Sequence, residues 1–384
     1  MNIIYVTSAM ETNDFVAYET EWSIPLNPSN QNFHNKIIRA LAKHNKVNVI
    51  SIRPFSRRYC SRYSLERSLT KEENIVWDYL AIIRRRFFRE YSLKIQIDDL
   101  LTDRKLDNTI VFVDTLSPTL LKIANYLKNN YNLKVIGICT DSPSNISGTT
   151  KIYTNKILDY SRNFDGFLAL TNELGDLFNK KSKPQLIFEG IVEDKLPNPI
   201  VNEFGDYFFF GGALMEKYGV FNLIKAFNEI EDHKMRLLIC GHHANEEQLN
   251  KAIEDNPRII YLGILPNKKV LQLEMNAIGN INPRPFSEDL DRFSVPSKTI
   301  EYISTGIPTI SVKNSKLKKN FNDNIIWAKT AEPGDLYNAM TKLLNLTEEE
   351  RKNFGLEAQA KVKSLYSLEA ISEKLDNFLL EFTK

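Results

Sequence analysis

Residues 207–227, YFFFGGALMEKYGVFNLIKAF, contain the three parts of a β–loop–α unit in one stretch. An apolar run ends in Gly211 and Gly212, and apolar residues recur at helical spacing after Tyr218. Continuously apolar strands are typical of parallel sheets that helices cover on both faces. The stretch therefore predicts a strand, a glycine-rich loop and a helix of an α/β domain.

The same alternation extends in both directions along the chain. Apolar runs separated by segments of helical spacing lie at 2–8, 46–52, 109–115, 133–141, 164–170 and 184–190, and again at 207–213, 235–241, 258–264, 277–283, 307–312 and 324–329. The proline-containing segment 192–206 separates the two series, and 384 residues exceed what one core usually supports. We predict an α/β protein of two Rossmann-like doubly wound domains facing a central cleft, residues 1–192 and 193–366, with a C-terminal helix over about 367–384 packing back on the first.

Composition and charge narrow the class of protein. With 42% hydrophobic and 26% charged residues, the chain has the composition of a folded globular protein. No apolar stretch reaches the ~18 residues that span a bilayer. The start, MNIIYVTSAM, lacks the features of a signal peptide, so we expect a cytoplasmic protein. Residues 51–96 carry a net charge of +6 and the remainder −4, and one short basic block does not favour nucleic-acid binding.

A second stretch, NPRPFSEDLDRFSVPSKTIEYISTGIPTI at 282–310, predicts a helix whose start suits an anion. Ser294 is a favourable N-cap and Gly306 a stop, so the helix should run from about 295 to 305. Its unpaired amides and the positive end of its dipole, with Lys298 in the first turn, would bind a diphosphate.

Glu301 lies on the same face of this predicted helix as Ser297 and Lys298. Its carboxylate could accept both hydroxyls of a vicinal diol, so the face predicts a nucleotide site. The alternative is an ordinary ion pair between Lys298 and Glu301 on a solvated helix.

The two stretches, with YLGILPNKKVLQLEMNAIGNINPRP between them, resemble the GT-B glycosyltransferases of family 4, especially bacterial enzymes of surface polysaccharide assembly. The resemblance covers nearly all of residues 206–345 and is weaker before them. It implies a nucleotide-sugar donor in the second domain and an acceptor in the first. The donor-binding residues are then Gly211, Gly212, Lys217, Ile264, Ser297, Lys298 and Glu301.

The sequence departs from the family's E-x7-E motif. Glu301 matches the second glutamate, which holds the ribose, but Phe293 stands in place of the first, which contacts the donor sugar. That contact would then come from the nearby acids Glu288, Asp289 or Asp291.

The glycine-rich loop departs from the family as well. Ala213 and Tyr218 stand where the family has arginine and lysine, and a tight turn alone would also explain the two glycines. The candidates for the missing positive charge are Lys217, Arg284 and Lys298.

Two segments of the first domain are candidates for catalysis and acceptor binding. In ICTDSPSN, Thr140 and Asp141 stand where many relatives have a histidine. Asp141 would orient the acceptor hydroxyl or take its proton, and alternatively it caps a turn. The segment NPSNQNFHNK takes the place of the usual loop between first strand and first helix, although asparagine and serine are also common caps. Its acceptor-binding candidates are Asn30, Gln31 and His34.

No metal or other cofactor is expected. The DLD at 289–291 has the form of a metal-binding D-x-D, but helix amides and a lysine can neutralise phosphate without a metal. His242 and His243 have no further ligand at metal-binding spacing.

Residues 74–91, NIVWDYLAIIRRRFFREY, place apolar residues on one helical face beside four arginines. The segment predicts an amphipathic helix that lies either on an anionic bilayer, at the inner face of the membrane, or on its own domain.

Together these residues predict transfer of a hexose-type sugar from a nucleotide-diphosphate-sugar to a saccharide acceptor, lipid-linked or part of a surface polysaccharide. Retention of configuration is implied by the resemblance. Asp141, Arg284 and Lys298 are the catalytic candidates. The alternatives are a non-catalytic binding or partner subunit and a nucleotide-sugar epimerase.

Overall fold

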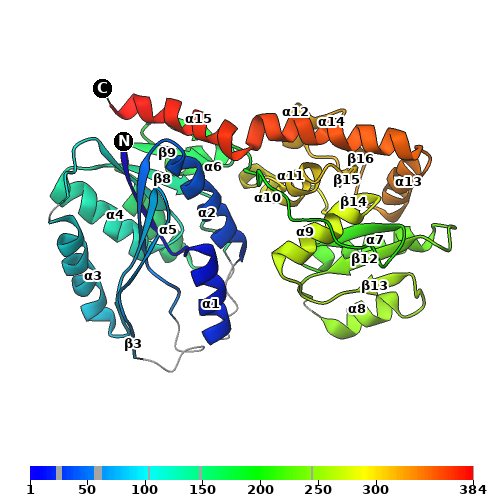
Figure 1. Cartoon of the computed structure of the whole chain (residues 1–384), viewed down its shortest axis with the longest axis horizontal. Coiled ribbons are helices and arrows are strands. Elements are labelled where there is room, and N and C mark those ends of the chain that lie inside the picture. Colours follow the sequence, from blue (N-terminus) through cyan, green and yellow to red (C-terminus); the bar gives the residue numbers. More distant parts are fainter. Residues whose placement is uncertain (23–27, 56–62, 103, 147–148, 244, 384) are drawn as a thin grey trace. The chain divides into compact units, whose positions relative to one another are not determined.

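The computed structural model describes residues 1–22, 28–55, 63–102, 104–146, 149–243 and 245–383, with the backbone alone at 22, 28, 86, 87, 289 and 290. The chain divides into two compact units (Figure 1). Unit 1 consists of Met1–Ile191 and Leu368–Lys384, and unit 2 of Val192–Ser367.

Unit 1 is built on an eight-stranded sheet in the order β10-β9-β8-β7-β1-β2-β5-β4. Neighbouring strands are parallel except for β4, which runs antiparallel to β5. The strands of this sheet are β1 Asn2–Thr7, β2 Lys46–Ser51, β4 Ser68–Lys71, β5 Ile75–Tyr79, β7 Thr109–Asp114, β8 Lys134–Cys139, β9 Gly166–Ala169 and β10 Gln185–Ile187; β3 Ser64–Leu65 and β6 Ile82–Ile83 form a separate pair. The helices are α1 Thr12–Trp22, α2 Pro28–Ala42, α3 Arg86–Leu101, α4 Pro118–Tyr131, α5 Lys151–Ser161, α6 Asn172–Phe178 and α15 Leu368–Leu379.

The C-terminal helix α15 packs on α2 of unit 1. Asp376 contacts His44 Nδ1 at 2.5 Å through one carboxylate oxygen, and its other oxygen accepts from Asn45 Nδ2 at 3.0 Å. Lys43 Nζ pairs with Glu369 at 2.5 Å. These polar contacts join the last helix of the chain to the end of an early one.

Unit 2 is built on a six-stranded parallel sheet in the order β13-β12-β11-β14-β15-β16. Its strands are β11 Tyr207–Gly211, β12 Arg236–Cys240, β13 Ile259–Tyr261, β14 Gly279–Asn282, β15 Thr309–Val312 and β16 Ile326–Ala328. Its helices are α7 Val220–Asn228, α8 Glu246–Ile253, α9 Asn267–Asn276, α10 Glu288–Phe293, α11 Ser297–Ser304, α12 Ser315–Phe321, α13 Pro333–Leu344 and α14 Glu348–Tyr366, with a short 3-10 turn at Glu216–Tyr218.

The core of unit 2 explains its continuously apolar strands. Phe208 and Phe210 of β11 pack with Leu237 into one buried cluster, whereas Tyr207 and Phe209 pack into a second. Because successive side chains of a strand point to opposite faces, both faces of this sheet are covered and neither favours polar residues. Each of the twelve predicted apolar runs contains a strand, and the predicted α/β fold of two doubly wound domains is confirmed.

The helix predicted over 74–91 is wrong. Residues Ile75–Tyr79 form β5, which pairs with β2 on one side and β4 on the other, and α3 begins only at Arg86. Ile75, Trp77 and Tyr79 are buried in unit 1, so the apolar face predicted for a bilayer belongs to the core. Their spacing of two residues fits a strand, and the sheet supplies partners on both edges that the sequence does not reveal.

Candidate functional site

The strand order of unit 2 brings two loops together at one edge of its sheet. In chain order the strands lie 3-2-1-4-5-6, so the direction of winding reverses between β11 and β14. Ligands of open α/β sheets bind outside the carboxyl ends of the strands at such a switch point. The loop after β11 and the segment after β14 are therefore the first candidates for a ligand site in this unit.

Two glycines that sequence reasoning missed hold the loop after β11 against its neighbours. Gly219 has φ +79°, and a Cβ there would lie 2.1 Å from the carbonyl oxygen of Pro283, directly after β14. Gly241 has φ +130°, and its Cβ would lie 1.8 Å from the carbonyl oxygen of Gly212. Only glycine fits these places. A Cβ on Gly212 itself would meet side-chain atoms of Phe210 no nearer than 3.4 Å, and the amide of Gly212 donates to the carbonyl of Cys240 at 2.9 Å.

Tyr302 joins the two candidate ligand-binding elements through its buried hydroxyl. The hydroxyl accepts a hydrogen bond from the amide of Gly211 at 2.9 Å and donates to the carbonyl of the same residue at 3.2 Å. Gly211 is the last residue of β11, and Tyr302 follows Glu301 directly on α11. The carboxyl end of β11 and the helix that carries Lys298 and Glu301 therefore keep a fixed spacing.

Lys298 and Glu301 pair with one another near the amino end of α11. Lys298 Nζ lies 2.7 Å from Glu301 Oε1, and the two side chains are 36% and 26% exposed. Burial would lower the pKa of Lys298, but the carboxylates of Glu301 and Glu274 outweigh it and hold that pKa above its ordinary value. A full positive charge therefore stands in the first turn of α11, at the amino end of its dipole. The nucleotide roles of these two residues stay predictions.

Glu274 is a buried carboxylate that sequence reasoning missed. It lies on α9, has no exposed surface, and acts electrostatically on Lys298 and Tyr302. A signal was present, because Glu274 lies four residues after Val270 and three before Ala277, both buried. A charged residue on the apolar face of a helix marks a site that requires charge.

Arg284 is fixed by the segment that follows β14. Its Nη2 lies 3.3 Å from Oδ1 of Asp291, whose Oδ2 accepts from the amide of Ser287 at 2.9 Å. Asp291 is buried, so its carboxylate holds Arg284 and the local turn in place of the predicted contact to a donor sugar.

The predicted N-cap of α11 is wrong. The helix begins at Ser297 after Pro296, which makes no side-chain cap. Ser294 lies before this start, and its Oγ instead accepts from Arg284 Nη2 at 3.2 Å. The first amides of α11 are thus not capped by the serine that the sequence suggested.

The other candidates of unit 2 lie on its surface. Lys217 lines a cavity of about 500 Å³ together with Met215 and Gln248. The side chain of Asp289 lies outside the described part of the structure. Four of the candidate residues of unit 2 are exposed, namely Lys217, Ile264, Glu288 and Ser297.

In unit 1, Asp141 and Thr140 follow β8 directly, at the carboxyl end of the sheet. Asp141 Oδ1 accepts from the amide of Ser142 at 2.7 Å and from Asn145 Nδ2 at 3.3 Å. The carboxylate of Asp141 therefore caps the turn after β8, which was the alternative role predicted for it. Both residues are half-buried, and their roles toward an acceptor stay predictions.

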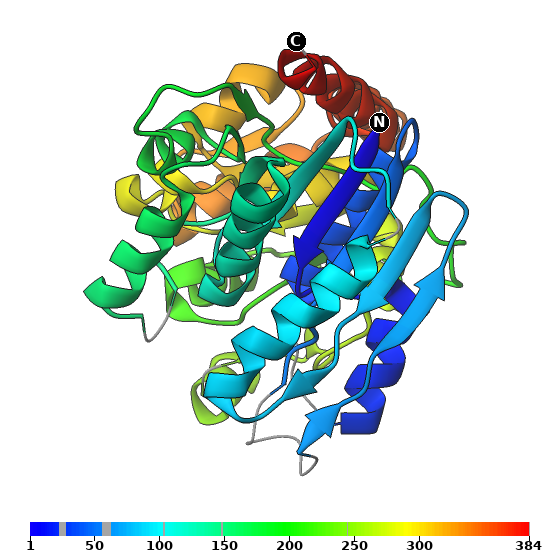
Figure 2. The same ribbon diagram turned by 90° about the vertical axis from the view of Figure 1, so that its left-hand side faces the viewer.

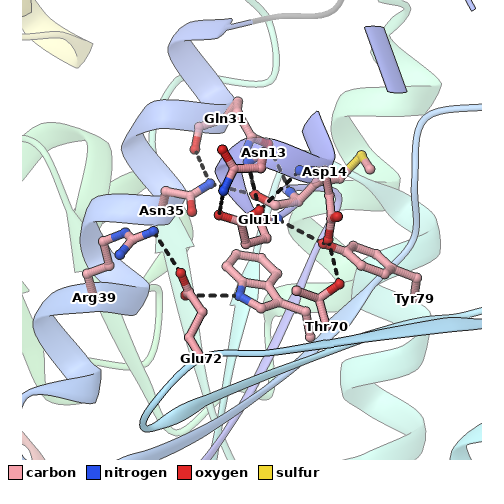
Figure 3. A network of polar contacts seen from close by, with 11 residues as sticks. Glu11, Asn13, Asp14, Gln31, Asn35, Arg39, Thr70, Glu72 and Tyr79 are labelled. Carbon is pink, nitrogen blue, oxygen red and sulfur yellow. Dashed lines mark hydrogen bonds and ion pairs between the residues drawn. The ribbon is translucent and has the colours of Figure 1, made fainter. Parts of the chain in front are cut away.

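The three predicted acceptor residues lie in the second helix, not in the first loop. Residues 12–22 form α1, and the segment from Pro28 belongs to α2. Gln31 is buried, and its amide accepts from the N–H of Met10 at 2.9 Å and donates to the carbonyl of Met10 (Figure 3). Gln31 therefore holds the loop after β1 rather than facing an acceptor.

His34 is likewise part of the core of unit 1. Its Nδ1 lies 2.6 Å from the hydroxyl of Tyr5, and its Nε2 lies 3.3 Å from Oδ2 of Asp114. Burial would raise the pKa of Asp114, but His34, the amide of Leu116 and the side chain of Asn30 lower it. His34 and Asn30 thus act on a buried carboxylate, and the predicted role of His34 in acceptor binding is wrong because its ring has no exposed surface.

A wider polar network surrounds the start of α1 in the same unit (Figure 3). Tyr79 donates to Oδ2 of Asp14 at 2.6 Å and accepts from the amide of Glu11 at 2.9 Å. Glu11 in turn accepts from the amides of Asn13 and Asp14, at 2.7 and 3.1 Å. The loop after β1 is therefore held by side chains of a strand and two helices.

Among the described residues, no group of three or more His, Cys, Asp or Glu side chains is placed to hold a metal ion. Within that same part of the chain, no helix is long and apolar enough to cross a membrane.

Two doubly wound α/β units in one chain are the architecture of the GT-B fold, and comparisons with known proteins agree. Residues 194–361 match the family model of the glycosyl transferases group 1. The matched region contains the glycine loop, Tyr302, Lys298 and Glu301. No curated protein sequence matches this chain.

Solved structures match over the whole length. The chain is similar to sucrose-phosphate synthase from Thermosynechococcus elongatus, with a TM-score of 0.68 at 11% identity, covering 100% of this chain and 99% of that one. It is similar to Anabaena HepE in complex with UDP, with a TM-score of 0.64 at 11% identity, covering 99% and 100%. It is also similar to the UDP-forming α,α-trehalose-phosphate synthase from Burkholderia xenovorans in complex with glucose-6-phosphate, with a TM-score of 0.67 at 10% identity, covering 99% and 100%. Together the comparisons show the GT-B fold over the whole chain and a match to the glycosyl transferases group 1 over residues 194–361.

Proposed function

We propose that this chain transfers a sugar from a nucleoside-diphosphate donor to a saccharide acceptor. The observation that carries the proposal is the joining of two elements at the switch point of unit 2. The end of β11 and the helix α11 are tied by Tyr302, and that helix presents Lys298 and Glu301. These are the groups that a diphosphate and a ribose diol require.

The chemistry follows from these groups. As the bond to the donor sugar breaks, negative charge develops on the leaving diphosphate. Amides of α11 and the ammonium of Lys298 stabilise that charge without rearranging, which is the most effective form of electrostatic catalysis. Glu301 accepts from the ribose hydroxyls, and in the absence of donor it pairs with Lys298.

The donor we propose to test first is a uridine-diphosphate hexose. HepE is described with UDP and the Burkholderia enzyme as UDP-forming. We also propose that transfer retains anomeric configuration and needs no metal, because helix amides and Lys298 already supply positive charge to the diphosphate. The acceptor is a saccharide, either lipid-linked or part of a surface polysaccharide, as the sequence resemblance implies.

The test uses the purified full chain with a panel of nucleotide-sugars, with and without a chelator. We expect slow release of a nucleoside diphosphate from one donor, unchanged by the chelator, and faster release once a saccharide acceptor is added. The anomeric configuration of the product, read by NMR, tests retention. Binding without release from any donor would refute transfer in favour of a binding subunit, and a changed sugar still attached to its nucleotide would indicate an epimerase.

A further inference from the structure

We infer that Asn282, the last residue of β14, is a positioning residue for the proposed reaction. Its buried side chain joins the first turn of α11 to the segment that carries Arg284, and it thereby sets the spacing between Lys298 and Arg284. The inference rests on the proposed function, in which Lys298 meets the leaving diphosphate and Arg284 is a second candidate cation. Asn282 acts through its neighbours and not through a contact with the donor.

β14 is unusually polar for an interior strand. It lies between β11 and β15, and its sequence GNIN places Asn280 and Asn282 on one face, where they are 0% and 6% exposed. The dark blue strand that starts at the N-terminus in Figure 2, β1, also lies between two strands but carries Ile3, Ile4 and Val6 as buried residues. Burying an amide costs free energy unless it is hydrogen-bonded, so two buried asparagines indicate a requirement other than packing.

Each end of the Asn282 amide contacts a different element. Nδ2 donates to Thr299 Oγ1 at 2.8 Å, and Oδ1 accepts from the backbone amide of Arg284 at 3.3 Å. Thr299 lies in the first turn of α11, directly after Lys298, and its hydroxyl oxygen lies 3.3 Å from Ser311 Oγ on β15. Thr299 and Ser311 are buried as well, so water competes little for these contacts. The side chains thus link β14, the start of α11 and β15.

Arg284 has a donor that no described part of the protein uses. Its Nε is buried and has no hydrogen-bond partner among the described residues. Arg284 lines a cavity of about 10 Å³ together with Asn282, Ser311 and Pro296, the residue before α11. That volume is room for about one water-sized group. An arginine with an unused donor beside the start of α11 is placed to contact a ligand that this helix binds.

The two cations need a fixed spacing because both would act on the charge of one leaving group. Lys298 directly precedes Thr299, and Arg284 follows Asn282 by two residues, so one side chain controls the position of both. Electrostatic stabilisation is most effective when the stabilising groups do not rearrange during the reaction. Loss of the Asn282 contacts would keep both charges but let their spacing vary. We therefore expect kcat to fall more than donor affinity.

Asn280 is a matched control on the same strand and the same face. Its Nδ2 donates to the carbonyl of Glu274 at 3.3 Å and to Thr305 Oγ1 at 3.4 Å. Thr305 is the C-cap of α11, so Asn280 holds the opposite end of the same helix. Asn282→Ala and Asn280→Ala therefore remove the same kind of buried amide from the two ends of α11.

The first measurement needs no donor. Hydrogen exchange of the full chain, read by mass spectrometry, reports local opening of α11. We expect Asn282→Ala to speed exchange in the first turns of α11 by at least about tenfold, and Asn280→Ala to act on its last turn. Equal exchange at the amino end of α11 in the two variants would overturn the inference, whatever the chain catalyses.

The second measurement is release of nucleoside diphosphate from the donor that the unmodified chain uses. Asn282→Ala should lower kcat roughly tenfold and change KM less than about threefold, while Asn280→Ala keeps kcat within about twofold. Thr299→Val removes the hydroxyl and should reproduce the loss, whereas Thr299→Ser keeps the hydroxyl and should retain kcat. Thermal melting of each variant shows that it is folded at the temperature of the assay.

The outcomes separate this inference from the proposed function. If the unmodified chain releases no nucleoside diphosphate from any donor, the proposed function fails, and hydrogen exchange alone decides whether Asn282 positions the start of α11. If the unmodified chain is active, equal kcat in the two asparagine variants overturns the inference, and so does a rise of KM alone in Asn282→Ala. A loss of kcat in Thr299→Ser as large as in Thr299→Val would also overturn it, because the hydroxyl would then not be the group that matters.

Discussion

Removing the hydroxyl of Tyr302 tests whether the glycine loop and α11 are positioned together. In Tyr302→Phe the ring stays and two hydrogen bonds to Gly211 are lost, at 2.9 and 3.2 Å. Both residues are buried, so the amide of Gly211 loses its partner where water cannot replace it. An unsatisfied buried donor costs about 1–3 kcal/mol, and we expect the free energy of unfolding to fall by that amount.

Tyr302→Phe should also weaken donor binding. Loss of a hydrogen bond that only stabilises the fold would leave donor binding unchanged. The carboxyl end of β11 would shift relative to Lys298 and Glu301, so amides and ammonium would no longer meet the diphosphate together. We expect roughly a tenfold loss of affinity for the nucleoside diphosphate, equivalent to about 1.4 kcal/mol. Isothermal titration calorimetry measures the affinity, and urea denaturation measures the stability.

Tyr207→Phe is the matched control. The hydroxyl of Tyr207 is also buried in unit 2 and donates to the carbonyl of Leu273 at 2.7 Å, at the opposite end of β11. This variant should lose comparable stability while donor affinity stays unchanged. If both variants bind the nucleotide equally well, or lose affinity equally, Tyr302 has no positioning role and the reasoning is refuted.

Four further changes have expected outcomes. Gly219→Ala should lower the free energy of unfolding by at least about 2 kcal/mol in urea denaturation, because φ is +79° and its Cβ would clash with a backbone carbonyl; a loss under about 0.5 kcal/mol would contradict this. Asp114 has a lowered pKa, so it contributes stability above about pH 4 that disappears as pH falls further; Asp114→Asn should flatten the dependence of unfolding free energy on pH in that range. Lys298→Ala should reduce kcat roughly a hundredfold in assays of nucleoside-diphosphate release, and unchanged turnover would remove it from catalysis. Glu301→Ala should raise KM for the donor more than it lowers kcat, and the reverse split would argue against a ribose contact.

Much of the fold could be predicted because buried parallel strands appear in the sequence as continuous apolar runs. The runs at β11 and β12 are apolar throughout since both faces of their sheet are covered. The region from β3 to β6 could not be predicted in the same way. There Ile75, Trp77 and Tyr79 satisfy a strand pattern, while the arginines after them suggested one helix with a basic face. The segment Ile75–Tyr79 forms a strand because it pairs with the edge of β2, and the sequence of the segment does not reveal that pairing.

The sequence predicted where some side chains of the candidate site stand, but not which partners other side chains have. Lys298 and Glu301 stand on α11 as their spacing indicated. The sequence suggested a helix cap for Ser294 and a sugar contact for Asp291. In the structure both side chains accept hydrogen bonds from Arg284, within the segment that follows β14. No local pattern distinguishes a carboxylate that faces a ligand from one that faces a neighbouring arginine.

The candidate site contains two kinds of contact. One is the ion pair of Lys298 and Glu301, and the other is the set of contacts that hold its backbone. An exposed or half-exposed pair contributes about 0–1 kcal/mol, so the proposed diphosphate and ribose diol would replace it at little cost. The contacts of Gly219 and Gly241 with backbone carbonyls are close and need not break when a ligand binds. The same is true of the bonds from Tyr302. In the proposed reaction, charged groups that exchange partners easily stand on backbone that neighbouring elements contact closely. Such an arrangement favours electrostatic stabilisation of a leaving group, since little reorganisation remains during the reaction.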